Sequence, residues 1–91
     1  MRKIEEQMWE AINSLEGWQG GNTAVSQTDS GAMVFLHGHH IATVNAITGK
    51  VTVNKRTLAE YPTNTTKSRL RALGVDVYTK KGSTYLDGAE V

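Results

Sequence analysis

The apolar residues near the N-terminus recur at the spacing of an α-helix. They are Ile4, Met8, Ala11, Ile12 and Leu15, with Trp9 beside the stripe. Glu5 and Glu6 fall in the first turn, where negative charge interacts favourably with the helix dipole. Gly17 follows the last apolar residue, at the position just past a helix that glycine favours. The pattern predicts an amphipathic helix that ends near Gly17, followed by a glycine-rich loop over residues 17–22.

From residue 23 the hydrophobic period changes to that of strands. Strand patterning covers residues 23–28, 32–36, 41–44 and 50–53, with turn signals at 29–31 and 48–49 and a bulge or tight bend expected at Gly38. The segment Met33–Leu36 is apolar on both faces, so it is expected to be a central strand covered on both sides. Val51 and Val53 are expected to face inward. The strands are expected to form a largely antiparallel sheet of hairpins.

The last third of the chain predicts one more helix and one more hairpin. Residues 63–66 read Thr-Asn-Thr-Thr and supply several helix caps, and Gly74 ends the short helix that follows. Residues 75–78 and 83–86 are expected to pair across Lys80-Lys81-Gly82, and the tail 87–91 is expected to fray. The chain is therefore predicted to be a single α+β domain over residues 1–91.

Composition narrows the class of protein. A chain of 91 residues without cysteine forms one domain, has no disulfide framework or thiolate zinc site, and fits a reducing compartment. No apolar run approaches the roughly 20 residues needed to span a bilayer. The N-terminus turns acidic at Glu5, where a signal peptide would turn apolar. A cytoplasmic protein without a membrane partner is expected.

Three segments resemble a set of small tailed-bacteriophage accessory proteins. They are Leu36-His37-Gly38 with Ile41-Ala42, the run Thr63-Asn64-Thr65-Thr66-Lys67-Ser68-Arg69-Leu70, and Gly82-Ser83-Thr84-Tyr85-Leu86. The resemblance covers about residues 34–86 and departs at Tyr61-Pro62, where the family pattern often has a tryptophan. It implies a phage accessory protein acting in the cytoplasm of an infected bacterium, and it implies no catalytic residues.

Charge is distributed unevenly along the chain. Residues 1–29 carry two basic and five acidic side chains, whereas residues 50–81 carry eight basic and two acidic ones. Such a basic segment is typical of a nucleic-acid surface, and equally of a solvated rim. The candidate binding residues are Lys55, Arg56, Lys67, Arg69, Arg71, Lys80 and Lys81 from this segment, together with Trp18, which either closes the core or makes an exposed contact.

The sequence contains no convincing motif for metal binding or catalysis. On a strand, His37 and His39 would share one face and His40 the other, too few ligands for zinc. The serines lie in no nucleophile-elbow pattern, the carboxylates are scattered, and phosphate-binding glycine loops are absent. We expect no metal, no cofactor and no enzymatic activity, with a small enzyme as the most distant alternative.

Two binding functions remain. The favoured one is a phage accessory protein that binds and modulates or inhibits a bacterial host protein, through the acidic N-terminal helix or the Trp18 loop. The alternative is a nucleic-acid-binding protein that uses the basic face of residues 50–81. The oligomeric state stays open, with a homodimer as one alternative.

Overall fold

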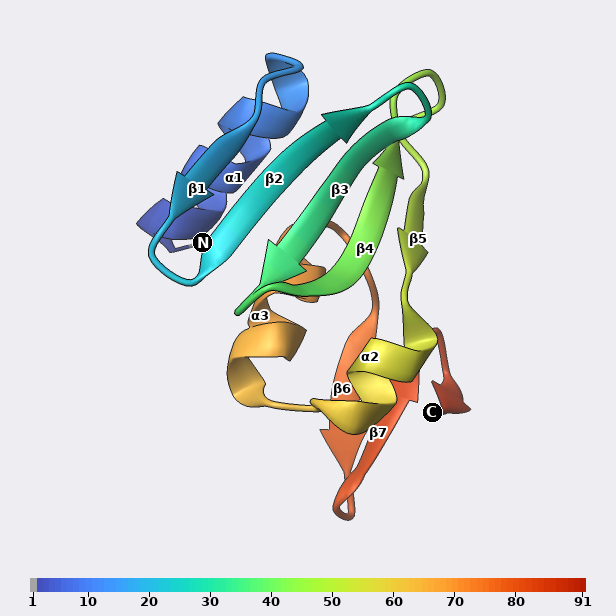
Figure 1. Ribbon diagram of the computed structural model, residues 1–91. Helices are drawn as coiled ribbons and strands as arrows, with labels where there is room; N and C mark the ends of the chain where they lie inside the picture. Colours follow the sequence, from blue (N-terminus) through green and yellow to red (C-terminus); the bar gives the residue numbers. More distant parts are fainter. Residues whose placement is uncertain (1) are drawn as a thin grey trace.

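The first half of the chain forms a five-stranded antiparallel sheet whose strands lie side by side in chain order (Figure 1). The computed structural model describes residues 2–91. The strands are β1 (Trp18–Gly20), β2 (Thr23–Thr28), β3 (Gly31–Leu36), β4 (His39–Asn45) and β5 (Val51–Val53). Short glycine-containing turns join them, and His37 and Gly38 form a tight two-residue turn with positive φ at both positions, as hairpins require. The predicted bend at Gly38 is confirmed.

Helix α1 (Lys3–Asn13) covers one face of this sheet and lies behind β1 and β2 in Figure 1. Met8, Ala11 and Ile12 are buried, as predicted, in the common core. The predicted helix end near Gly17 is wrong, because the helix already stops at Asn13. The residue with positive φ after the helix is Leu15, whereas Gly17 does not have positive φ. Leu15 consequently leaves the apolar stripe and is 67% exposed.

The second half of the chain packs below the sheet in Figure 1. Its elements are α2 (Lys55–Glu60), α3 (Asn64–Ala72) and a small antiparallel sheet of β6 (Val77–Lys80), β7 (Ser83–Leu86) and β8 (Ala89–Glu90). Thr63 caps α3, and its hydroxyl accepts a hydrogen bond from the Thr66 amide. Leu70 and Leu73 bury the inner face of this region against the same core. The α+β class is confirmed.

Three elements differ from the sequence prediction. Residues 18–20 form an edge strand, not a loop, because they pair with residues 23–25 of β2. Residues 55–60 form a second short helix that Asn54 caps by accepting a hydrogen bond from the Thr57 amide. The tail does not fray, because an Asp87-Gly88 turn brings residues 89–90 back against β7.

The two faces of the large sheet differ in what covers them. On β3, Val34 and Leu36 are buried in the core, whereas Met33 and Phe35 are half-buried on the opposite face. No other element of residues 2–91 lies over that opposite face, which is turned toward the viewer in Figure 1. Strand β3 is central, as predicted, but the expectation that both of its faces are covered is wrong. We call the uncovered side the open face.

Candidate functional site

Arg69, one of the predicted binding residues, lies in the interior and is 3% exposed. Its Nη1 donates to Glu5 Oε2 at 2.8 Å, and its Nε donates to Thr23 Oγ1 at 2.9 Å. Its Nη2 donates to Asn22 Oδ1 at 3.3 Å. The guanidinium therefore holds α1, β2 and α3 together. Arg69 is therefore not among the accessible cations, since its side chain is used inside the fold.

Glu5 is the counter-charge of this cluster and is also buried. Ser68 Oγ donates to Glu5 Oε2 at 2.6 Å, and the Arg2 amide donates to Oε1 at 3.2 Å. Burial alone raises the pKa of Glu5, but the hydrogen bonds from Ser68, Arg69 and the Arg2 backbone, with the charge of Arg69, outweigh it. The pKa of Glu5 is therefore lowered, and the carboxylate is charged at neutral pH.

Lys67 and Arg71 lie on the other flank of α3 and face β6. Lys67 is 5% exposed, and its amine donates to the hydroxyl of Thr79. The Arg71 side chain is exposed, but its Nε donates to the Val77 carbonyl at 2.9 Å. Only Arg71 of the two remains accessible to a partner.

The remaining predicted cations are exposed. Arg56 forms an ion pair with Glu60 at 3.3 Å on the surface of α2. Lys55 is exposed at the start of the same helix, and Lys80 and Lys81 are exposed at the turn between β6 and β7. The structure therefore divides the seven candidate binding cations into two buried residues and five accessible ones. The basic surface is smaller than the sequence suggested.

Trp18 is half-buried and packs against the core. Its ring lies over Gly20, where a Cβ would come within 2.3 Å of the indole, so a side chain at position 20 would displace the ring. The interpretation of Trp18 as a residue that closes the core fits this placement. A contact with a partner would use only the exposed part of the ring.

The three histidines do not converge on one point. His39 stacks on Tyr61 with ring centroids 4.3 Å apart, and His37 lies in the exposed turn. His40 is directed to the open face, where its Nε2 lies 2.8 Å from Thr43 Oγ1. Within residues 2–91, no three histidine, aspartate or glutamate side chains gather closely enough to hold a metal ion.

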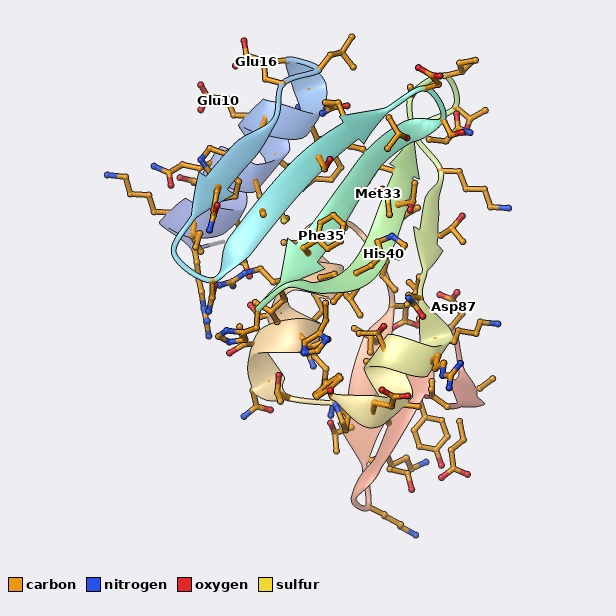
Figure 2. All side chains as sticks on the ribbon, in the orientation of Figure 1. Glu10, Glu16, Met33, Phe35, His40 and Asp87 are labelled. Atoms are coloured by element: carbon orange, nitrogen blue, oxygen red, sulfur yellow. The ribbon has the colours of Figure 1, made fainter. Side chains whose placement is uncertain are left out.

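The open face brings apolar and hydrogen-bonding side chains together beside a hollow. Figure 2 shows Met33, Phe35 and His40 beside one another over β3 and β4. The Phe35 and His40 rings are tilted, with centroids 5.6 Å apart. Beside Phe35 is a hollow of about 390 Å³, whose walls include Gln19, Ala24 and His37. This face offers half-buried apolar side chains, a hydrogen-bonding imidazole and a recess.

Sequence reasoning missed the open face, although the pattern contained a signal. Across four strands, one row of this face reads Ser26, Met33, Thr43 and Thr52. A face whose neighbouring positions are polar is typical of one that contacts solvent. Comparison of β3 with its neighbours would therefore have placed Met33 and Phe35 on a solvent-facing surface.

The structure of residues 2–91 contains no helix that is both long and apolar enough to cross a membrane. Comparison with curated proteins and with solved structures gives no significant match. The family model for the Kyanoviridae Gp96 protein matches residues 1–91, which includes the N-terminal helix that the phage resemblance omitted. The chain is a phage protein and belongs to the Kyanoviridae Gp96 family.

Proposed function

We propose that this protein is a non-catalytic phage accessory protein that binds a bacterial host protein in the host cytoplasm and modulates or inhibits it. The observation that supports this function best is the pair Met33 and Phe35 on the open face. Antiparallel sheets with one face in solvent ordinarily alternate apolar residues inside with polar residues outside. The central strand β3 departs from that rule, because it places the apolar Met33 and Phe35 on the solvent-facing side.

The chemistry of the open face suits a protein partner. Methionine and phenylalanine are enriched in the buried centres of protein–protein interfaces, and methionine adapts its shape to a partner surface. The recess beside Phe35 can accept one partner side chain. His40 is already oriented by Thr43 and can exchange hydrogen bonds at the rim of the contact.

We place the partner contact on the open face instead of on the acidic N-terminal helix or the Trp18 loop, where the sequence analysis expected it. Trp18 packs against the core. Figure 2 shows Glu10 and Glu16 at the α1 side of the molecule, away from Met33 and Phe35. An acidic surface of this kind adds long-range steering of a basic partner but little binding energy. The apolar side chains supply the larger share of the affinity.

The test is capture of a host protein by immobilised purified protein, followed by quantitative binding to the identified partner. Ser26→Arg is the decisive variant, because Ser26 is exposed on the open face opposite Met33 and its replacement removes no core contact. We expect this variant to remain folded and to lose most of the binding. The matched control is Ile47→Ser, which removes an apolar side chain that is 95% exposed at the turn between β4 and β5.

Two results would contradict the proposal. One is a captured partner whose affinity is the same for Ser26→Arg as for the unmodified protein. The other is an Ile47→Ser variant that loses binding as strongly as Ser26→Arg. Either result would place the contact away from the open face.

A second candidate function, nucleic-acid binding, is supported by the hairpin of β6 and β7. Tyr78 and Tyr85 are paired across the two strands and stack with centroids 5.3 Å apart and an interplanar angle of 6°. Lys80 and Lys81 follow at the turn and are exposed. Aromatic side chains beside cations are the means by which proteins bind single-stranded nucleic acid, and such binding weakens with salt.

A further inference from the structure

Strand β5 is an edge strand whose outer backbone groups have no partner among residues 2–91. It pairs only with β4. The Lys50 carbonyl accepts from the Asn45 amide at 2.8 Å, and the Asn54 amide donates to the Ile41 carbonyl at 2.8 Å. Alternate residues of an antiparallel strand direct their backbone groups to the same side. Lys50, Thr52 and Asn54 therefore face β4, and the N–H and C=O groups of Val51 and Val53 face outward.

A groove lies beside β5. Its volume is about 500 Å³, and it lies between β5 and the segment that leads from α3 into the small sheet. Its apolar walls come from Val51, Val53, Leu73, Val75 and Leu86. Asp87 also lines the groove, and Figure 2 shows it near the end of β5. The groove is therefore bounded by β5, with the side chains of Val51 and Val53, on one side and by Leu73, Val75 and Leu86 on the other.

The charged residues along the groove favour an acidic occupant. Lys50 and Lys55 line it, are exposed, and take part in neither of the two ion pairs found in residues 2–91. Asp87 is the one carboxylate in the lining, so cations outnumber anions along it. An acidic segment that runs along β5 can pair with both lysines while its backbone bonds to Val51 and Val53.

We propose that β5 and its groove form a second binding site, distinct from the Met33 and Phe35 contact, which takes an extended acidic peptide as an added antiparallel strand. The bound strand receives hydrogen bonds from two N–H groups and donates to two C=O groups. A second copy of the chain fits less well than an acidic peptide. Pairing two β5 strands about Thr52 would bring Lys50 of one copy close to Lys55 of the other, and like charges would repel.

The test uses a blocked synthetic heptapeptide of sequence Asp-Val-Glu-Val-Thr-Val-Glu, titrated into ¹⁵N-labelled protein. We expect a dissociation constant on the order of 0.1–1 mM, with the largest shifts at the amides of Val51 and Val53. An otherwise identical peptide carrying N-methyl groups at alternate amides keeps its charge but loses its hydrogen bonds to the strand. It should bind at least tenfold more weakly.

Charge is tested with Lys50→Glu/Lys55→Glu, which should weaken binding roughly tenfold, because two attractive contacts become repulsive. The control is Lys80→Glu/Lys81→Glu, which changes charge equally at the distant hairpin turn and should leave the affinity within about twofold.

The proposal is overturned if the heptapeptide causes no shifts at Val51 and Val53, or if N-methylation leaves the affinity unchanged. It is also overturned if shifts gather at Lys80 and Lys81, or if the protein dimerises through β5 without peptide. Because Ser26 and Met33 lie outside this groove, Ser26→Arg should bind the peptide normally. Ser26→Arg therefore tests host-protein binding without changing peptide binding. The two proposals can thus be refuted independently.

Discussion

The buried ion pair of Glu5 and Arg69 supplies the sharpest test of how this fold is held together. Its partners are 64 positions apart in the chain and belong to α1 and α3. The side chains of the pair are 4% and 3% exposed. We consider Glu5→Gln, which keeps the size of the side chain and one hydrogen-bond acceptor while it removes the charge.

The expected cost follows from what the substitution leaves behind. The introduced amide can still accept from Ser68 or Arg69, but the guanidinium of Arg69 stays buried without a counter-charge. Removal of one partner of a buried ion pair typically costs about 3–5 kcal/mol, and the retained acceptor places Glu5→Gln near about 3 kcal/mol. For a domain of this size, that corresponds to a decrease in melting temperature of roughly 12–24 °C.

The same pair predicts how the cost depends on pH. The pKa of Glu5 is lowered in the folded state, whereas an unperturbed glutamate has a pKa of roughly 4.3. Between these two values the unfolded chain binds more protons, so stability rises with pH. The contribution of Glu5 is fully present above roughly pH 5 and is lost as pH falls through its folded pKa. Because glutamine does not titrate, the stability difference should shrink at acidic pH.

The assay is urea denaturation of both proteins at several pH values from 7 down to 3. The control is Glu60→Gln, which breaks an exposed ion pair with Arg56 and should change the free energy of unfolding by less than about 1 kcal/mol. A Glu5→Gln cost below about 1 kcal/mol, or a cost that is constant across this pH range, would refute the assignment of Glu5 and Arg69 as a charged interior pair.

Two further predictions follow from burial and charge. Phe35→Ala should lower the free energy of unfolding by only about 1–2 kcal/mol, because Phe35 is half-buried on the open face and its removal leaves no enclosed cavity. Leu70→Ala should lower it by about 2–5 kcal/mol, because Leu70 is fully buried. Equal urea midpoints for the two variants would contradict this difference. If Lys80 and Lys81 contact two phosphates, binding to a single-stranded oligonucleotide should fall roughly sevenfold between 50 and 200 mM salt, and Lys80→Ala/Lys81→Ala should remove that dependence, as measured by fluorescence anisotropy.

The parts of the fold that depend on neighbouring residues could be predicted from the amino-acid sequence. The helical stripe of Met8, Ala11 and Ile12, the Thr63 cap and the turn at Lys81-Gly82 all appear as predicted. Each depends on contacts within about one turn or one hairpin. The turn at Asp87-Gly88 carried an equally local signal and was predictable from its Asp-Gly pair.

Which surfaces are available to a partner depends on long-range packing, which the local sequence pattern does not show. Hydrophobic period shows which side of a strand or helix a residue faces, but not what covers that side. Met33 and Phe35 therefore appeared as core residues until the sheet was seen to have an open face. Lys67 and Arg69 likewise appeared as surface cations, because their partners lie 12 and 64 positions away. Charge and spacing indicate a binding surface, whereas long-range packing determines which of its residues remain exposed.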